Sequence, residues 1–368
     1  MHAPDRNVGI LALNAGSSSL KFGIYTADGA EPVERLSGSV ESDGDRHVFL
    51  LDSAQGHPLR RSVRAASPVQ AIFLLGEARE WPPAVIGHRI VHGGTALRQH
   101  TRVDDSVLRQ LDAASVFAPL HVPPALKLVV DSMATFPQAT QIACLDTAFH
   151  NGLPDLARVL PLPAAIRNEG VERVGFHGLS CESVVHQLGQ DCPSRMVIAH
   201  LGSGCSVTAV RDGHSVDTSM GLTPAGGVMM ATRPGDIDPG VLLYLLRDGR
   251  YSTAMLEDMF ERHAGLSGVS GGSADARELL AKSPTEPMAA LALQQFTRSV
   301  AKHIAGMIVT LGRIDLLVFT GGIGEHALTL RADILHHLAP LVSDLAVRVV
   351  PARENDCIAR HAWKLARH

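Results

Sequence analysis

The chain carries one short pattern twice, as ILALNAGSSSLKFGIY at residues 10–25 and as MVIAHLGSGCSVTAV at residues 196–210. In each copy an apolar run leads into a tip of small and hydroxyl-bearing residues, and a second apolar run follows, which is typical of a β-hairpin. The alignment pairs Asn14 with His200 and Ser17 with Ser203. The copies lie about half a chain length apart, which indicates a duplicated domain, although one hairpin match alone is also compatible with chance.

Around the two hairpins, strand and helix patterns alternate, which places the fold in the α/β class. The length of 368 residues suggests two domains. Further strands are expected at 85–91, 141–145, 314–319 and 347–350, and helices at 104–117, from about Pro124 to Pro137, at 287–311, 325–338 and 354–366.

Composition limits the classes of function. The net charge is −4 and aromatic residues make up 4% of the chain, which argues against binding to nucleic acid or to an anionic membrane. The five cysteines form neither a CxxC pair nor a zinc-binding spacing, so they are expected to be reduced thiols of a cytoplasmic protein. Neither a signal peptide nor a membrane-spanning helix is expected.

Three glycine-rich tips, at 14–19, 200–205 and 320–324, each follow an apolar strand. Backbone amides at such tips can bind phosphate oxygens, because glycine lets the ligand approach closely. Three ordinary tight turns would account for the same residues. The chain lacks a Walker A motif and a complete GxGxxG motif, so an ordinary P-loop or Rossmann site is not expected.

Four polar residues outside these tips stand out by their sequence context. Arg89 lies inside an apolar strand, where its charge needs a partner, and Arg233 lies in a loop before a helix. Each arginine fits either a structural salt bridge or a clamp for a carboxylate or phosphate. Asp146 ends a strand, where α/β sheets place their ligands. His177 precedes a helix that Ser180 is expected to cap, and a lone histidine is usually structural.

The sequence Gly268-Val-Ser-Gly-Gly272 matches the nucleophile-elbow pattern of serine hydrolases. That elbow needs a strand before the serine and a helix after it. Residues 257–263 read as a helix instead, so Ser270 is expected in a loop and hydrolase chemistry is disfavoured.

Nine segments resemble the acetokinase family, which comprises acetate kinase and its short-chain acyl kinase relatives. They follow one another in the family order: NAGSSSLKF, GHRIVHGG, DTAFH, GFHGLS, HLGSGCSVTAV, TSMGLTP, ATRPGDIDP, FTGGIGE and PARE. The resemblance implies a duplicated α/β fold of the actin, hexokinase and Hsp70 type (ribonuclease H-like), with a mixed five-stranded sheet in each domain. It implies an N-terminal acyl kinase domain, 1–147 with a returning helix at 355–368, and a nucleotide-binding domain at 148–354.

The resemblance also assigns roles to residues. Asp146, His177 and Arg233 would be catalytic, and Arg89 would bind the acyl carboxylate. Apolar residues around the acyl methyl would be Val91, Leu120 and Pro224, and the residues supporting a metal ion would be Asn14 and Glu354. The nucleotide would be bound by Lys21, His200, Leu201, Gly202, Ser203, Gly204, Asp275, Ala276, Arg277, Gly322, Ile323, Gly324, Glu325 and His326. Acetate needs no deprotonation at neutral pH, which favours a role for Asp146 in orienting substrate, arginine or metal over that of a base, and its proton chemistry stays open.

The activity implied is reversible phosphoryl transfer from ATP to acetate, with Mg²⁺ (or Mn²⁺ in its place), giving acetyl phosphate and ADP in a cytoplasmic homodimer. Two alternatives remain open, a propionate or butyrate kinase of the same family and a non-catalytic ATP-binding protein of the same fold. The chain departs from the family at Val122 and His326, where asparagine is usual, and at Ala276, where an aromatic residue is usual. The last two changes predict relaxed selectivity for the nucleotide base.

Overall fold

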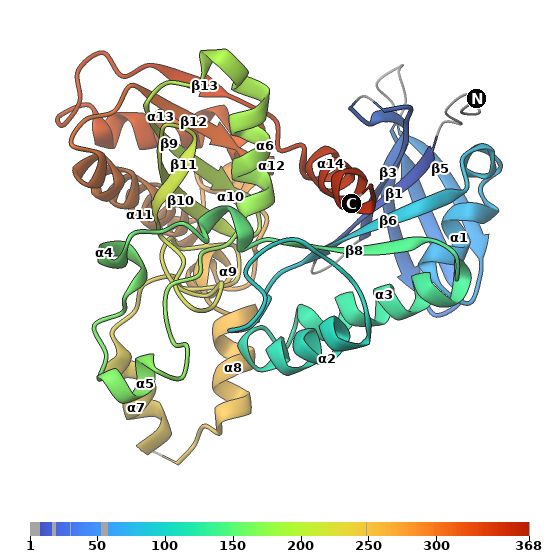
Figure 1. Cartoon of the computed structure of the whole chain (residues 1–368). Helices are drawn as coiled ribbons and strands as arrows, with labels where there is room; N and C mark the ends of the chain where they lie inside the picture. Colours follow the sequence, from blue (N-terminus) through green and yellow to red (C-terminus); the bar gives the residue numbers. More distant parts are fainter. Residues whose placement is uncertain (1–7, 17–19, 30, 53–57, 248, 368) are drawn as a thin grey trace. The chain divides into compact units, whose positions relative to one another are not determined.

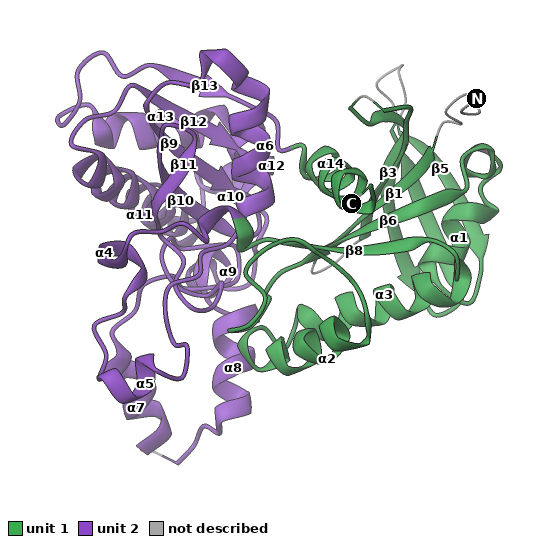
Figure 2. Cartoon of the chain, viewed as in Figure 1, with its two compact units in different colours: residues 1–148, 353–368 green, residues 149–352 purple. Residues whose placement is uncertain are grey.

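The computed structural model describes residues 8–16, 20–29, 31–52, 58–247 and 249–367 of the chain. Ser17, the sequence counterpart of Ser203, lies outside these residues. The chain divides into two compact units, the first formed by residues 1–148 and 353–368 and the second by residues 149–352 (Figure 2). The C-terminal segment thus belongs to the same unit as the N-terminal hairpin.

The first unit is built on a mixed sheet with the strand order β5-β4-β3-β2-β1-β6-β8-β7 (Figure 1). β1 runs antiparallel to β2 and parallel to β6, which in turn runs parallel to β8. The first hairpin is formed as predicted, with Asn14 opposite Lys21. The strands are β1 (Val8–Ala15), β2 (Leu20–Ala27), β3 (Val33–Asp43), β4 (Arg46–Leu51), β5 (Leu59–Arg64), β6 (Pro83–Ile90), β7 (Thr101–Arg102) and β8 (Thr140–Leu145).

The second unit repeats the central part of that sheet. Its strand order is β11-β10-β9-β12-β13, with β9 antiparallel to β10 and parallel to β12. The order and directions match those of β3-β2-β1-β6-β8, so the duplication extends to the whole central sheet. The first unit differs from the implied five strands by the addition of β4, β5 and β7. The strands here are β9 (Arg195–Leu201), β10 (Cys205–Arg211), β11 (His214–Thr218), β12 (Leu316–Thr320) and β13 (Val347–Val349).

Helices cover both faces of the first sheet. Ile86 of β6 belongs to the same apolar cluster as Ile72 and Leu128, whereas its neighbour Gly87 faces Ile358, whose Cγ2 would lie 2.6 Å from a Cβ at position 87. Because side chains alternate along a strand, α14 covers one face and α1 and α3 cover the other. Glycine at position 87 lets α14 approach the sheet closely. The helices are α1 (Pro68–Leu74), α2 (Asp105–Ala113), α3 (Val122–Thr135) and α14 (Glu354–Ala366).

The second unit is richer in helices. The longest, α11, packs against β9 and β10 and ends as expected at Gly312, which adopts a φ of 78°. The other helices are α4 (Asp155–Arg158), α5 (Ala164–Arg167), α6 (Gly178–Leu188), α7 (Pro239–Arg247), α8 (Thr253–Arg262), α9 (Gly265–Ser270), α10 (Ala276–Lys282), α12 (Gly321–His326) and α13 (Leu328–Leu338), with α11 spanning Pro287–Leu311.

Two local expectations are wrong. Residues 321–324 do not form a turn before a helix, because α12 begins directly after β12. Gly321 makes this start possible: its φ is 78°, and a Cβ there would lie 2.8 Å from the Leu201 carbonyl oxygen. Ser180 does not cap α6, since His177 occupies the N-cap position and the Ser180 hydroxyl instead shares a 2.8 Å hydrogen bond with His200 Nδ1.

Ser270 of the 268–272 segment was expected in a loop, and this expectation is also wrong because the residue ends a short helix. Gly268 and Ser270 belong to the short helix α9, which follows α8 rather than a strand. The Ser270 hydroxyl donates to the carbonyl oxygen of Ser273 at 2.9 Å. The geometry of a nucleophile elbow is therefore not present in this segment.

Among the described residues, no helix combines the length and the apolar character needed to cross a bilayer.

Candidate active site

The polar side chains predicted for acyl and metal binding in the first unit lie at the carboxyl ends of neighbouring parallel strands. Asn14 lies near the end of β1, Arg89 near the end of β6, and Asp146 directly after β8. Parallel strands present their carboxyl ends at the same edge of a sheet, where α/β proteins bind ligands. The topology therefore accounts for the meeting of residues so distant in sequence.

Arg89 and Asp146 form the centre of this cluster. Arg89 Nε and Nη2 donate to the same carboxylate oxygen of Asp146, at 3.0 and 2.5 Å. Asp146 is fully buried, and 14% of the Arg89 side chain is exposed. Burial alone would lower the pKa of Arg89, but the carboxylates of Asp146 and Glu354 outweigh it and raise that pKa above its ordinary value. The guanidinium therefore stays charged, with one edge held by Asp146.

Asn14 connects Arg89 to the C-terminal helix. Asn14 Nδ2 donates to Glu354 Oε2 at 2.7 Å, and Glu354 is the first residue of α14. Arg89 Nη1 donates to the Ala15 carbonyl oxygen at 3.2 Å and lies 3.4 Å from Asn14 Oδ1. The structure thus brings together both predicted metal-supporting residues, the predicted carboxylate-binding arginine and Asp146.

The remaining predicted residues of this unit surround that cluster at different depths. Lys21 is exposed and lies opposite Asn14 in the β1–β2 register, so the two side chains share a face of the sheet. Val91 is buried directly after β6, and Leu120 is 36% exposed in the segment before α3. Val122, the departure from the family pattern, is fully buried as the first residue of α3.

His177 lies at the start of α6 in the second unit. Its Nδ1 shares a 2.9 Å hydrogen bond with the Ser206 hydroxyl, and its ring stacks on that of His200 with centroids 4.2 Å apart. A Cβ at Gly204 would lie 3.2 Å from His177 Nε2, so this nitrogen faces the second glycine tip. His177 is therefore held on one side and presents its other nitrogen to the tip.

Arg233 approaches the same tip. A Cβ at Gly204 would lie 3.7 Å from Arg233 Nη1, and that nitrogen also donates to the Pro224 carbonyl oxygen at 3.2 Å. Behind the tip, Ala231 N donates to the Ser203 carbonyl oxygen at 3.2 Å, and Gly202 N donates to that of Gly204 at 3.0 Å. The backbone thus fixes the tip between two side chains that can donate hydrogen bonds to an anion.

Glu261 at the end of α8 completes this group and was not predicted from the sequence. Its Oε2 lies 2.8 Å from Arg233 Nε, and the two side chains are 18% and 13% exposed. The carboxylate holds one edge of the Arg233 guanidinium, as Asp146 holds one edge of Arg89. Nothing in the spacing of positions 233 and 261 indicates this contact, because the loop between them sets it.

The residues predicted to contact adenosine occupy two helix starts. Asp275 caps α10 by accepting from Arg277 N at 2.8 Å, and it also pairs with the exposed Arg277 side chain. Ala276 is buried, so it offers no surface comparable to an aromatic ring. In α12, Glu325 Oε1 accepts from Gly321 N and Ala352 N at 3.1 and 3.0 Å, so this carboxylate stabilises the helix start itself. Gly322 and His326 of α12 are exposed, whereas Gly324 is buried.

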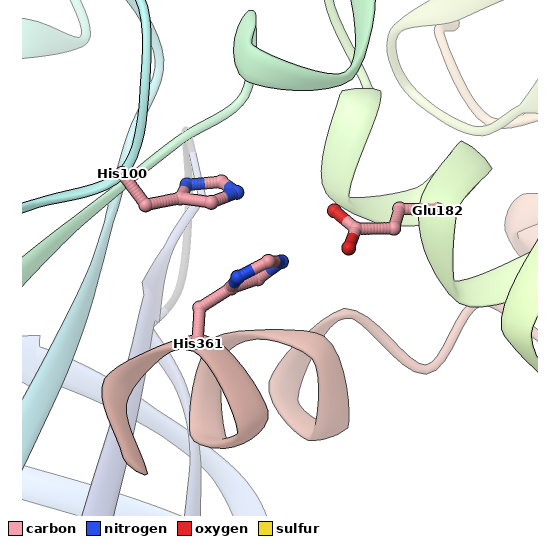
Figure 3. Close-up of side chains that lie close together, drawn as sticks. All are labelled: His100, Glu182 and His361. Carbon is pink, nitrogen blue, oxygen red and sulfur yellow. The ribbon is translucent and has the colours of Figure 1, made fainter. Parts of the chain in front are cut away.

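Two histidines that the sequence did not single out lie close together in the first unit. The rings of His100 and His361 have centroids 3.8 Å apart (Figure 3). Leu145 N donates to His100 Nδ1 at 3.0 Å, so neutral His100 carries its proton on Nε2. In that tautomer His100 is not a metal ligand, and its bond instead fixes the backbone before Asp146. Glu182, also labelled in Figure 3, lies on α6 of the second unit.

Comparisons with known proteins identify the family of the chain. The sequence profile of the acetokinase family matches residues 9–361. An acetate kinase of Rhodopseudomonas palustris strain TIE-1 is 37% identical over 392 residues, covering 97% of this chain and 98% of that protein. A propionate kinase of Yersinia enterocolitica is 40% identical over 352 residues, covering 92% of this chain and 85% of that protein.

Solved structures show the same likeness. A propionate kinase from Francisella tularensis superposes with a TM-score of 0.88 at 30% identity. The superposition covers 97% of this chain and 100% of that chain. The acetate kinase of Porphyromonas gingivalis superposes with a TM-score of 0.84 at 28% identity, with 98% of this chain and 100% of that chain covered. Family profile, curated relatives and solved structures therefore lead to one conclusion: this chain belongs to the acetokinase family.

Proposed function

We propose that this protein is an acetate kinase, which transfers the γ-phosphoryl group of ATP reversibly to acetate and gives acetyl phosphate and ADP. The observation that carries the proposal is the convergence of His177 and Arg233 on Gly204 of the glycine tip. Two donors aimed at a glycine backbone suit a transferring phosphoryl group, whose charge must be stabilised as it moves. Membership of the acetokinase family and the relatives named acetate kinase support the choice of acceptor.

In the proposed reaction a carboxylate oxygen of acetate attacks the γ-phosphorus, and the bond from that phosphorus to the β–γ bridging oxygen breaks. ADP leaves with that oxygen, so the step needs no proton transfer. Acetate and ATP are both anions, so their approach requires cationic groups. We assign the acetate carboxylate to Arg89, the transferring phosphoryl group to His177 and Arg233, and the nucleotide phosphates to Lys21 and residues 200–204.

Asp146 acts in this proposal through Arg89. Its carboxylate accepts two bonds from the guanidinium and keeps the remaining edge, with Nη1, in a fixed direction. A carboxylate substrate is already ionised at neutral pH, so the reaction does not call for a base at this position. The same logic applies to Glu261, which holds Arg233 through Nε.

The donor chemistry of Asn14 and Glu354 fits a role in supporting Mg²⁺. Both offer oxygen atoms, which Mg²⁺ prefers, but Asn14 Nδ2 occupies one Glu354 oxygen and the Arg89 guanidinium lies close to Asn14 Oδ1. Few protein ligands are typical of Mg²⁺ bound mainly by water and substrate phosphates. When bound, the ion neutralises charge on the phosphates, and Mn²⁺ has the same preference for oxygen.

The division of labour between the units is part of the same proposal. We assign acyl chemistry to the first unit, which holds Asn14, Arg89 and Asp146. We assign nucleotide binding to the second unit, which holds residues 200–204, 275–277 and 322–326. Val91, Leu120 and Pro224 remain predictions for the environment of the acyl methyl. None of the five cysteines, all of which the structure describes, forms a disulfide bond, which suits a reducing compartment such as the cytoplasm.

The test is detection of acyl phosphate as its hydroxamate, with ATP and Mg²⁺ and with acetate, propionate or butyrate as acceptor. We expect the highest kcat/KM for acetate, measurable activity with propionate and poor activity with butyrate, because one extra methylene discriminates by about 1–3 kcal/mol. A higher kcat/KM for butyrate than for acetate would assign the chain to the alternative acyl kinases. No product with any of the acids would refute the proposal.

The same assay tests the phosphoryl donor. We expect ATP to be used, with GTP and CTP also accepted, because the buried Ala276 offers the base no aromatic face. Loss of a stacking partner costs a base about 1–3 kcal/mol. Strict use of ATP would contradict relaxed selectivity, and use of pyrophosphate without ATP would contradict the donor itself.

A further inference from the structure

His177 adopts a backbone conformation that needs support from its surroundings. Its φ is 58° and its ψ is 27°, in the left-handed region. Among the described residues, only Asp212 and Asp344 share a positive φ without being glycine. A non-glycine residue in this region costs about 1–2 kcal/mol, so neighbouring contacts must hold it there.

The contact that fixes the peptide group before His177 comes from His150. His150 Nε2 is 2.9 Å from the carbonyl oxygen of Phe176, and the peptide bond that follows this carbonyl is the one that ends at His177 N. A carbonyl oxygen only accepts, so His150 donates from Nε2. The plane of this peptide group is thereby held from its oxygen side, and φ of His177 is measured from that plane.

His150 is itself held on two further sides. Its Nδ1 shares a 2.8 Å hydrogen bond with the hydroxyl of Ser215, on β11. The ring also packs against Gly175, where a Cβ would lie 2.7 Å from the ring atoms Cγ and Cδ2. His150 is 2% exposed. These contacts hold the ring in one position. Through the ring, the 176–177 peptide group is held at a fixed place relative to β11.

We infer that His150 is a positioning residue for phosphoryl transfer: its Nε2–H holds the Phe176 carbonyl and so keeps His177 in the left-handed conformation that aims its Nε2 at Gly204. This inference rests on the proposed function and assigns a role to a residue that does not touch the substrates. A hydrogen-bonded path joins Ser215, His150 and the backbone next to His177, and all of it lies within the second unit.

The charge state of His150 agrees with this role. Burial lowers the pKa of His150 to about 4, although the bond to the Phe176 carbonyl opposes the shift. The ring is therefore neutral at pH 7, with its single proton on Nε2 and with Nδ1 accepting from Ser215. One tautomer satisfies both partners.

The chain offers a matched control in His47. His47 is 1% exposed, its Nδ1 shares a 2.7 Å hydrogen bond with the Ser42 hydroxyl, and its Nε2 bonds the Ala65 carbonyl oxygen at 3.2 Å. The partners are of the same kinds as those of His150, but His47 lies on β4 of the first unit. Replacement of His47 should cost stability and leave kinetics unchanged.

The experiment compares His150→Phe, His150→Gln and His47→Phe by thermal melting and steady-state kinetics. We expect His150→Phe to lower kcat about 30-fold or more while KM for acetate and ATP stays within about threefold, because His177 acts on the transferring group. His150→Gln keeps a donor at the position of Nε2 and should recover part of the loss. A kcat of folded His150→Phe within about threefold of that of the wild type would overturn the inference.

Two further measurements distinguish a role through His177 from a purely structural one. In a His177→Ala background, adding His150→Phe should lower kcat no further, whereas additive losses would show that His150 does not act through His177 and would overturn the inference. If His150→Phe does not fold, Ser215→Ala, with Ser42→Ala as its control, should still lower kcat severalfold, and an unchanged kcat would overturn it. If the wild type transfers no phosphoryl group, the proposed function fails, and the crystal structure of His150→Phe or Ser215→Ala then decides: a retained positive φ at His177 overturns the inference.

Discussion

Arg89 is a charged side chain inside an apolar strand, and its surroundings show how the fold tolerates it. The Asp146 carboxylate is fully buried, so its charge needs the charge of Arg89 as much as Arg89 needs that of Asp146. The structural salt bridge and the anion clamp that the sequence left as alternatives are therefore compatible. The Asp146 carboxylate binds one edge of the Arg89 guanidinium, and in the proposed function acetate binds the other edge.

We predict that Arg89→Ala raises KM for acetate about a hundredfold, equivalent to about 3 kcal/mol, because one well-placed cationic donor is lost. The melting temperature should fall as well, since the Asp146 carboxylate is left buried without its cation. Steady-state kinetics and thermal melting measure both effects. Arg64→Ala, which removes an exposed pair with Asp45, is the control and should change neither quantity appreciably. An unchanged KM for acetate would show that Arg89 does not bind the substrate.

Glu261 gives a second prediction at the scale of one residue. Glu261→Ala should lower kcat about tenfold or more with little change in KM for acetate, because Arg233 loses the partner that holds its Nε edge. Glu257→Ala, one turn earlier on α8 and exposed, is the matched control. Equal kinetics for the two variants would mean that the Arg233–Glu261 pair contributes to folding alone.

At the scale of single residues, the sequence indicates which residues are important. It is less informative about which groups those residues contact. Arg89, Asp146 and His177 draw attention by their chemistry inside apolar or glycine-rich runs. Glu261 and His150 do not, because an exposed-looking acid on an amphipathic helix and one of 19 histidines carry no distinctive pattern. Their contacts, with Arg233 and with the Phe176 carbonyl, depend on loops whose path is set by tertiary packing.

At the scale of elements, strands, long helices and the starts of α2, α11 and α14 follow from local patterns, whereas the helix starts at glycine-rich segments do not. Apolar runs predicted the strands around both hairpins, and Gly312 marks the end of α11 as expected. The start of α6 was misjudged, because Ser180 looks like a cap but His177 takes that position in a conformation unusual for its residue type. The glycines after β12 were misjudged for a related reason: the contact of Gly321 with Leu201 lets a helix begin where a turn was expected.

Helix α11 is tied to the loop that carries Arg233 by a pair that depends on pH. His303 Nε2 lies 3.2 Å from Asp236 Oδ2. Burial and the charge of Lys302 would lower the pKa of His303, but the bond to Asp236 outweighs them and raises it. The same bond, opposed by partial burial, lowers the pKa of Asp236, with help from Gly227 N. Both side chains are therefore charged at pH values between the pKa of Asp236 and the pKa of His303.

We predict that His303→Gln destabilises the protein more at pH 6 than at pH 9. A histidine whose folded pKa is raised contributes stability that is fully present below its unfolded pKa, about 6.5, and that is lost as pH rises through the folded value. Melting curves of the wild type and the variant at the two pH values measure this difference. His263→Gln, which removes a largely exposed pair with Asp258, should show little dependence on pH. A larger loss at pH 9 would reverse the assigned charge state.

At the scale of the whole molecule, the repeated hairpin predicted more than its own residues. The two central sheets share strand order and direction, and Asn14 and His200 occupy the same position next to the end of β1 and β9. The added strands β5 and β7 were less accessible, because short strands rich in charged residues resemble loops in composition. A duplication is easiest to find where both copies keep the same short tip.

The second unit also exposes an apolar helix, which supports the expected homodimer. No residue of α7 is buried, although the helix carries Leu243, Tyr244 and Leu246, which are 51%, 62% and 43% exposed. Large exposed apolar surfaces usually mark an interface. Asp238 precedes the helix and Arg247 ends it. Two copies of α7 packed antiparallel about a twofold axis would place each acidic end beside the basic end of the partner, which favours a second copy of this chain as the occupant.

We therefore predict that the wild type is a dimer in solution and that Leu243→Glu dissociates it. The dissociation constant should rise about a hundredfold or more, because a twofold interface buries one introduced charge from each of the two copies. Light scattering coupled to size-exclusion chromatography, across a range of protein concentrations, measures the mass. Val309→Glu is the control, since Val309 is 81% exposed on α11 of the same unit and lies outside the proposed interface. Melting curves of both variants separate dissociation from unfolding. A monomeric wild type, or a Leu243→Glu variant that stays dimeric at low concentration, would exclude α7 as the dimer interface.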